Sequence, residues 1–459
     1  MRFCLNKTSI HVCLIVSFSL LVSGCNGLRK RSFEQISEDV ITDVILQDIE
    51  KSGKLFPDDY FNHSLEPSLL DYNPKHQKAW LENAVELHNE LLQVDGFEPD
   101  YQELSFYLER IVSLDSNELY QYPISPFFGP HLDTPNFLTS IPLASRNQIE
   151  HYIELLTEVE NQFGGLIDAL EFQRKRGLIL PTFLLDEVIH QCDSITLQSS
   201  EENILYTHCK NQLDKIGILE PTIKQQYLVQ VATALSQSVY PAYVRLANYL
   251  RQLERHSTSV AGLWQYEVGN SRYQNLVHLN AGANVSVDTL NLIGRLELNR
   301  LQGEILILEN LVQNVEISAI DTLRFPNVSF VKRVVSSSQL EEGYKLFFSK
   351  YTGNLSPEKH LSNLKNQRLA ILALLVDIGI HHKRWLREQG IDFVLKNCDL
   401  TKTEAQLLTD KSISKPGYSV VTAVTFLRLC ELYEDGEIDL ARFYQKVTDR
   451  GYVPVVLLN

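Results

Sequence analysis

Apolar side chains recur at three- and four-residue steps through almost the whole chain, which is the spacing of one face of an α-helix. Residues 76–94, with Trp80, Leu87 and Leu91, show this pattern. The same pattern recurs in four longer segments, 145–177, 221–256, 286–312 and 361–390. One stretch alone, 327–335 (NVSFVKRVV), is strand-like. The pattern predicts a mainly α-helical fold of long amphipathic helices with little or no sheet.

Several helix ends are marked by their sequence. Ser145 is a typical N-cap and Gly177 a typical helix end, and Pro221 suits a first helical turn. Pro241 should kink or break the long segment 221–256, because proline has no N–H to donate inside a helix. Residues 119–144 contain five prolines and are predicted to be a loop-rich stretch. No repeat or linker divides the chain, so we expect one helical domain over residues 33–459.

The N-terminus has the form of an export signal, with a short apolar run behind Arg2 and Lys7. Val22-Ser23-Gly24-Cys25 resembles the bacterial lipobox, in which the cysteine is lipidated and becomes the first mature residue. We therefore expect a signal peptide over 1–24, a lipid on Cys25 and a tether over 25–32. Asn26 stands where an inner-membrane retention signal usually has aspartate, which favours the outer membrane, facing the periplasm. The predicted membrane contact is the lipid anchor.

The charge and the cysteines of the chain indicate which class of partner is excluded and whether disulfides are expected. The net charge is −15, and the acidic residues are dispersed along the chain, which argues against nucleic acid as a partner. After Cys4, Cys13 and Cys25, four cysteines remain in a compartment that favours disulfides. These are Cys192, Cys209, Cys398 and Cys430. One arrangement has disulfides between Cys192 and Cys209 and between Cys398 and Cys430, because each pair is close in sequence. The other arrangement has four buried free thiols, and the sequence favours neither.

No common catalytic motif is present. The chain lacks a His-Glu-x-x-His core, a histidine pair four residues apart, a Gly-x-Ser-x-Gly elbow and a phosphate-binding glycine loop. His131, beside Asp133 in the GPHLD loop, would either position a substrate or fix the loop by hydrogen bonds. In the segment 376–390, read as one helix, Asp377, His381, Trp385 and Glu388 share a face, and His382 points elsewhere. This face would form one wall of a site or hold an ordinary half-buried histidine.

Six motifs together resemble, in this order, the large bacterial family known as domain of unknown function 885. They are YPISPFFGPHLDTPNFL, VYPAYVRLANYLRQLE, GLWQYEVGNSRY, EEGYKLFF, VDIGIHHKRWLREQGIDF and RGYVPVVLL. The resemblance covers roughly residues 30–459. It implies an exported, zinc-metallopeptidase-like protein. Typical members have a His-Glu-x-x-Pro-Gly-His motif, a following Glu-Gly-Trp motif and an Asp-x-Gly-x-His helix, which together supply metal ligands, a general base and the wall of the site.

This chain retains only part of that pattern. Glu342-Gly343-Tyr344 matches Glu-Gly-Trp with a changed aromatic residue, and Asp377 to His381 match the Asp-x-Gly-x-His helix. The His-Glu-x-x-Pro-Gly-His motif is absent, and the segment 294–342 is much shorter than in typical members. Members read Glu-Ile-His-x-Leu-Gly where this chain has 289–294 (TLNLIG), so the acid and the histidine are both replaced.

The resemblance therefore implies a catalytically inactive, lipid-anchored relative of metallopeptidases with no metal or other cofactor. It would bind a peptide or an envelope protein through a residual cleft, with His131, Glu342, Asp377, His381, Trp385 and Glu388 as its candidate residues. One alternative is a hydrolase with a rebuilt site around Glu342, His381 and Glu388. Another is a purely structural envelope protein.

Overall fold

The described part of the chain is built from helices. The computed structural model describes residues 31–47, 68–94, 96, 98, 100–113, 122–217, 219–281, 285–310, 337–351, 355–436, 439–450 and 453–458. Beyond helices, these ranges hold one isolated bridge, between Ser125 and Phe128. The mainly α-helical prediction is confirmed. The signal peptide, Cys25 and the strand-like stretch 327–335 lie outside the described ranges.

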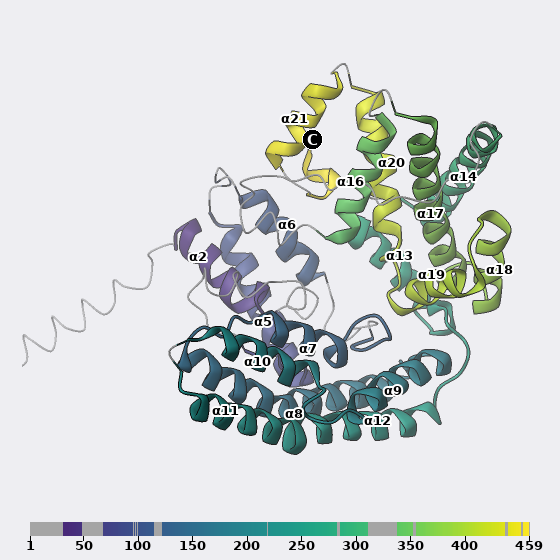
Figure 1. Ribbon diagram of the computed structural model, residues 1–459. Coiled ribbons are helices and arrows are strands. Elements are labelled where there is room, and N and C mark those ends of the chain that lie inside the picture. The colour runs from purple at the N-terminus through teal and green to yellow at the C-terminus, as the bar shows by residue number, and fades with distance from the viewer. Residues whose placement is uncertain are drawn as a thin grey trace, which may run out of the picture.

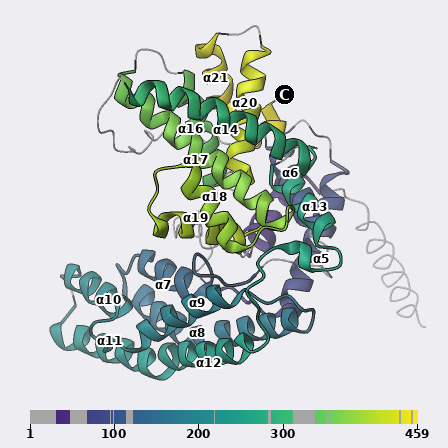
Figure 2. The same cartoon turned by 90° about the vertical axis from the view of Figure 1, so that its right-hand side faces the viewer.

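A layer of long helices forms the lower part of the molecule in Figures 1 and 2. It comprises α7 (Pro130–Ser140), α8 (Arg146–Arg174), α9 (Thr182–Thr196), α10 (Ile204–Lys215), α11 (Pro221–Ala234) and α12 (Tyr240–Glu254). Its core is a large cluster of buried leucine, valine and isoleucine side chains with the aromatic rings of Tyr152, Phe163 and Tyr243. Burial of this apolar surface is the main force that holds the layer together.

The remaining helices form two groups above this layer (Figure 1). One group comprises α2 (Phe33–Asp39), a π-helical turn (Val40–Ile45), α5 (Pro74–Leu91) and α6 (Tyr101–Val112). The other comprises α13 (Gly269–Ala281), α14 (Val287–Glu309), α16 (Ser338–Tyr351), α17 (Pro357–His381), α18 (Arg387–Asn397), α19 (Lys402–Ser414), α20 (Val420–Glu434) and α21 (Leu440–Arg450). Short 3-10 turns lie at Leu263–Gln265 and Val455–Leu458.

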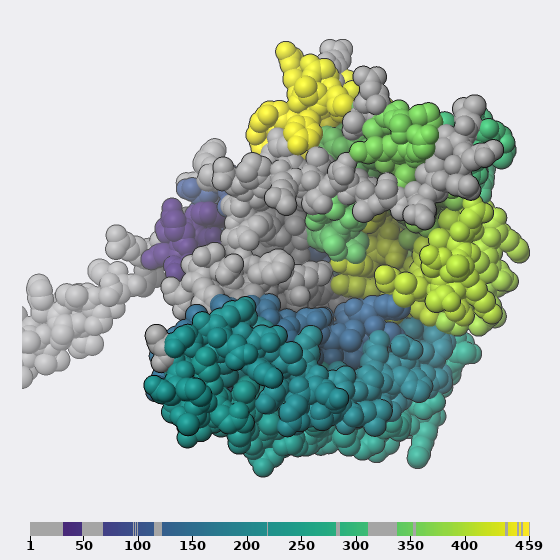
Figure 3. Space-filling view, in the orientation of Figure 1, coloured from purple at the N-terminus to yellow at the C-terminus, as the bar shows by residue number. Residues whose placement is uncertain are grey.

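Helix α17 connects the layers, because its C-terminal half is buried on every side. Val376 and Ile380 belong to the core of the lower layer, whereas Leu374 and Ile378 belong to the core around α13, α14 and α20. A helix that is apolar all round has no solvent face and must lie inside the protein. In the space-filling view the yellow-green surface of α18 and α19 lies directly on the blue-teal surface of the lower layer (Figure 3). The candidate site residues of α17 thus lie at this junction.

The helix ends predicted by the capping signals are confirmed. The Ser145 side chain accepts from the N–H of Gln148, whose side chain bonds back to Ser145, so the two residues form a capping box. Gly177 adopts a φ of 80°, the left-handed conformation that follows many helices. Pro221 is the first residue of α11. The segment predicted to kink or break at Pro241 stays helical, and a π-helical turn, Leu235–Val239, joins α11 to α12 just before this proline.

The prediction for residues 119–144 was wrong in its second half, where α7 forms. Pro130 is tolerated because it lies in the first turn of the helix. Pro135 lies inside the helix and has no N–H for the carbonyl of His131. The Tyr243 hydroxyl of α12 donates to that carbonyl instead, at 2.7 Å. The helix therefore depends on a hydrogen bond from a distant part of the chain.

The prediction of one helix over 361–390 was also wrong, because α17 ends at His381 and α18 begins at Arg387. Arg384 adopts a φ of 61°, which breaks the helix between them. The Trp385 N–H turns back to the carbonyl of Gly379 at 2.8 Å. Trp385 and Glu388 consequently do not continue the face of Asp377 and His381.

Two further features concern the N-terminal end of the described body and the lengths of the helices. Ser32, at the end of the predicted tether, caps α2, and Arg31 forms an ion pair with Glu90 at 2.8 Å. These two residues therefore belong to the folded body. Within the described ranges, no helix is both long enough and apolar enough to span a bilayer.

Candidate functional site

His381 lies in the interior at the C-terminal end of α17 and has no exposed surface. Its Nε2 donates to the carbonyl of Ser412 in α19 at 3.0 Å. Its Nδ1 accepts from the N–H of Leu263 at 3.3 Å. The two bonds fix one neutral tautomer and occupy both ring nitrogens. Burial lowers the pKa of His381 to about 4, so the ring stays uncharged at neutral pH.

Asp377 lies one turn before His381 on the same helix and is fully buried. Its Oδ1 accepts from the Tyr273 hydroxyl of α13 at 2.6 Å and from the N–H of Gly417 at 3.0 Å. Gly417 follows α19 with a φ of 76°, which glycine adopts without strain. Burial raises the pKa of Asp377 to about 7, although these hydrogen bonds act in the opposite direction. Asp377 thus connects α13, α17 and the turn after α19.

Two of the sequence motifs meet in this buried network. Leu263 and Tyr273 belong to the stretch GLWQYEVGNSRY, and both contact residues of the Asp-x-Gly-x-His stretch. The Tyr273 ring also lies against His381, with ring centroids 5.4 Å apart. Reasoning from spacing missed Tyr273, Ser412 and Gly417, because each contact joins residues far apart in sequence. The presence of Tyr273 in a long motif was the one available signal.

Trp385 packs against Gly379, which lies two residues from both Asp377 and His381 and therefore on the opposite side of α17. A Cβ at Gly379 would lie 2.1 Å from the Cε3 atom of Trp385, so the ring occupies the space that any other side chain would need. The ring also lies against Phe393 of α18, at a centroid distance of 5.0 Å. The glycine of the Asp-x-Gly-x-His stretch therefore has a packing role.

The two glutamates of the predicted cleft are exposed at other places. Glu342 lies on α16 and forms an ion pair with Lys345 at 3.1 Å, with half of its side chain exposed. Beside it, Gly343 lets α16 approach α20 closely, and Tyr344 donates to the carbonyl of Val453 at 2.6 Å. Glu388 lies exposed in the first turn of α18. The structure does not bring Glu342, His381 and Glu388 together as metal ligands, and no group of three such side chains suited to a metal occurs among the described residues.

His131 fixes its own loop. Its Nε2 donates to Gln191 at 2.9 Å, and Gln191 in turn donates to the carbonyl of Pro126 at 3.1 Å. Asp133 accepts from the N–H of Gly129 at 2.7 Å. Burial lowers the pKa of His131 to about 4. These contacts favour the loop-fixing interpretation of the GPHLD motif.

The four remaining cysteines are buried and unpaired in the structure. This is the second of the two arrangements that the sequence allowed. Burial raises the pKa of Cys192 and of Cys209 to about 12 and that of Cys430 to about 11. A thiol with a raised pKa carries little thiolate at neutral pH and is a poor nucleophile or metal ligand.

The fold is shared with two solved structures. One is a candidate lipoprotein from Colwellia psychrerythraea, which is 16% identical, with a TM-score of 0.78 over 93% of this chain and 97% of the other. The second is a candidate lipoprotein of unknown function from Shewanella oneidensis, which is 14% identical, with a TM-score of 0.59 over 90% of this chain and 98% of the other.

The sequence comparisons agree with the resemblance of the motifs. No curated protein matches the chain. The sequence profile of a bacterial family matches residues 59–330 and 324–459, which is most of the chain. The chain belongs to the bacterial proteins of unknown function designated DUF885.

Proposed function

We propose that the protein is a lipid-anchored envelope protein that acts by binding a peptide or a protein partner and does not catalyse hydrolysis. The lipobox at Cys25 and the two structural neighbours described as lipoproteins support the anchor. The absence of the His-Glu-x-x-Pro-Gly-His motif from the sequence supports the non-catalytic role.

The observation that carries the proposal is that hydrogen bonds occupy both ring nitrogens of His381. A zinc ligand needs a ring nitrogen with a free lone pair that faces the metal. In His381 one nitrogen carries the proton that is donated to Ser412, and the other accepts the N–H of Leu263. The glutamates that would complete a rebuilt site are exposed on α16 and α18. Asp377 and His381, which are retained from the metallopeptidase pattern, therefore hold helices together.

Metal binding tests this proposal. The full chain, purified without a chelator, should contain well below one equivalent of zinc by elemental analysis. Added zinc should leave the Tm within about one degree, because a ligand stabilises a protein only when it binds the folded state tightly. Incubation with a mixed peptide library should leave the peptides intact by mass spectrometry. One tightly bound zinc that disappears in His381→Ala, with peptide cleavage lost in the same variant, would overturn the non-catalytic role.

A further inference from the structure

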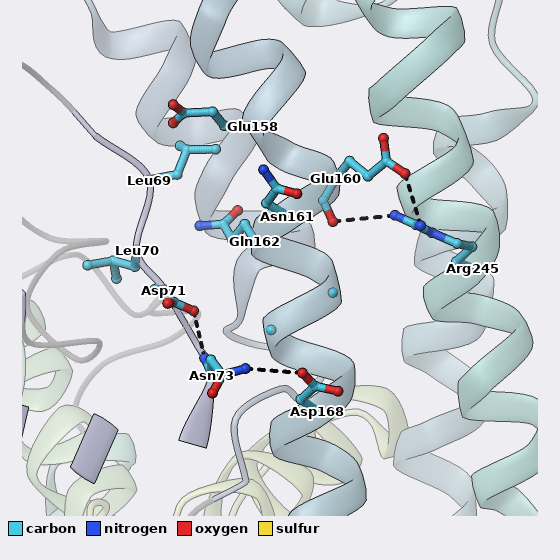
Figure 4. Close-up of a pocket in the computed structure, with 12 residues that line it drawn as sticks. Leu69, Leu70, Asp71, Asn73, Glu158, Glu160, Asn161, Gln162, Asp168 and Arg245 are labelled. Carbon is cyan, nitrogen blue, oxygen red and sulfur yellow. Dashed lines mark hydrogen bonds and ion pairs between the residues drawn. The ribbon is translucent and has the colours of Figure 1, made fainter. Parts of the chain in front are cut away.

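A pocket of about 570 Å³ lies on the lower layer (Figure 4). None of its lining residues belongs to the buried network of Asp377 and His381. Its walls are the segment before α5, the middle of α8 and one residue of α12. The lining residues are Leu69, Leu70, Asp71, Asn73, Glu158, Glu160, Asn161, Gln162, Gly164, Gly165, Asp168 and Arg245. The volume falls within the roughly 300–1,000 Å³ of small-molecule sites.

Two adjacent glycines of α8 shape this pocket. At Gly165 a Cβ would lie 3.0 Å from both the N of Asn73 and the Oδ1 of Asp71, so the glycine lets the segment Asp71–Asn73 lie close to the helix. The hydrogen bond from Asn73 Nδ2 to Asp168 Oδ2, at 3.1 Å, holds the segment there. At Gly164 a Cβ would meet nothing within 4 Å. The surface of α8 at Gly164 therefore has free space above it in the pocket.

The pocket is strongly acidic. Its single guanidinium, Arg245, is 3.0 Å from Glu160 and is neutralised by it. Three carboxylates remain that have no lysine or arginine partner in the described part of the chain, Asp71, Glu158 and Asp168. His76 lies 3.6 Å from Asp71, at the exposed edge. A positively charged ligand should therefore bind in this pocket more tightly than a neutral one of the same shape.

A buried amide adds a second requirement. Gln162 is 6% exposed, and its Oε1 accepts from the Thr134 hydroxyl at 2.7 Å. Its Nε2 has no protein partner in the described residues, and the side chain projects from α8 toward the segment of Leu69 and Leu70 (Figure 4). The Nε2 atom is the part of this side chain that is open to the pocket, so it can donate to a ligand that brings a carbonyl oxygen.

We propose that this pocket binds a peptide segment through a lysine or arginine side chain, with Gln162 donating to a peptide carbonyl. Glu158, which lies beside Leu69 in Figure 4, would face the cationic head, and Leu69 and Leu70 would contact the methylene stem, which is apolar in both side chains. Asp71 and Asp168 lie farther along the pocket and add to its negative potential. A divalent cation fits less well, because no three of these carboxylates are grouped closely enough to hold one. The inference rests on the proposed peptide-binding role and adds its location and its preferred side chain. The zinc measurements above test the non-catalytic role alone, so they neither support the inference nor weaken it.

Calorimetric titration of the full chain with acetyl-Gly-Lys-Gly-amide tests the pocket. We expect saturable binding that weakens severalfold between about 50 mM and about 500 mM NaCl, because screening shortens the range of charge attraction. The same peptide with glutamine or glutamate in place of lysine should bind at least tenfold more weakly. Equal binding of the three peptides would overturn the proposal.

Two variants place the binding in this pocket. Gly164→Leu places a large side chain in the free space of the pocket and should weaken peptide binding more than tenfold. Gly303→Leu adds the same side chain at an equally open glycine of α14 and should leave peptide binding unchanged. Glu158→Gln should weaken binding about two- to fivefold, as expected for one exposed charge pair. Glu187→Gln, at an exposed position of α9 outside the pocket lining, is its matched control. Full binding in Gly164→Leu would refute the location.

A third comparison tests the carbonyl contact of Gln162. Pentylamine has the cation and the methylene stem but no carbonyl. We expect pentylamine to bind more weakly than the peptide. In Gln162→Met the ratio of the two affinities should be at least threefold smaller than in the unchanged protein. Circular dichroism of the variant checks that it is folded. If pentylamine binds as tightly as the peptide in the unchanged protein, the pocket recognises amines and the assignment to a peptide is wrong.

Discussion

At the residue scale, three buried groups link stability to pH in opposite directions. Burial lowers the pKa of His131 and of His381 to about 4, so each histidine contributes stability above its ordinary pKa of 6.5 that is lost as the pH falls toward 4. Burial raises the pKa of Asp377 from 3.8 to about 7. The unfolded chain therefore binds fewer protons at this position than the folded chain between these two values. Stability from Asp377 falls as the pH rises through that window.

Asp377→Asn should remove the loss of stability that ionisation of Asp377 causes as the pH rises. The amide keeps an oxygen for Tyr273 and Gly417 but does not ionise. Relative to the unchanged protein, the variant should gain on the order of 2 kcal/mol in free energy of unfolding between pH 5 and pH 8. Urea denaturation at both pH values measures this gain. The exposed Asp392→Asn should show no such gain, and parallel pH profiles for Asp377→Asn and the unchanged protein would contradict the assignment.

At the element scale, two helices have a form that their own sequence does not determine. The segment 361–390 has helical periodicity throughout, but the chain turns at Arg384 because Trp385 packs back onto Gly379. In α7, Pro135 leaves the carbonyl of His131 without its helical donor, and Tyr243 of α12 supplies one. In both cases a side chain from outside the helix decides where the helix ends or whether it forms.

The contact between Gly379 and Trp385 predicts a strong coupling. Gly379→Ala should lower the free energy of unfolding by about 1–3 kcal/mol, because the new methyl group occupies the space of the indole ring. In a Trp385→Ala background the same change should cost nothing or stabilise by about 0.5–1 kcal/mol, the helix-forming advantage of alanine. Gly303→Ala, at an open helical position, is the matched control and should stabilise in both backgrounds. Additive effects in a denaturation cycle would show that the two residues do not interact.

The hydrogen bond of Tyr243 predicts a second coupling. Tyr243→Phe should lower the free energy of unfolding by about 1–3 kcal/mol, because it leaves a buried carbonyl of α7 without its donor. Pro135→Ala restores an N–H four residues after His131, so the cost of Tyr243→Phe should be smaller in that background. Thermal or urea denaturation of the four proteins measures this difference. An unchanged cost would mean that Tyr243 does not replace the missing helical donor.

At the scale of the whole molecule, the apolar cores meet around α17, and the acidic surface carries a pocket on the lower layer. The described body begins at Arg31, six residues after Cys25. Arg31 and Ser32 are held by Glu90 and by the first turn of α2. If Cys25 is lipidated, the anchor holds the folded body close to the membrane surface.

Replacement of Cys25 tests the anchor. Cys25→Ser should move the protein from the membrane fraction to the soluble periplasmic fraction, because a lipid chain contributes about 0.8 kcal/mol of membrane affinity per buried CH₂ group. Immunoblots of fractionated cells measure this shift. Cys192→Ser, which removes a buried thiol, should leave the protein in membranes. Membrane association that survives Cys25→Ser would contradict lipidation.

The sequence by itself determined the features that depend on neighbours along the chain. Helical periodicity predicted the all-helical body, and the signals at Ser145, Gly177 and Pro221 predicted where helices begin and end, because capping bonds form within a few residues. The family resemblance rested on motifs that are also local in sequence. Residues Asp377 and His381 were correctly placed on one helix.

Only the tertiary structure decided what these residues do. The N–H of Leu263 and the carbonyl of Ser412 occupy both nitrogens of His381, and these partners lie 118 and 31 residues away from it. The positions of Glu342 and Glu388 on separate exposed surfaces, the turn at Arg384 and the acidic pocket on α8 likewise depend on packing between distant segments. Periodicity reports which face of a helix is buried, but the identity of the atoms that meet that face is set by the fold.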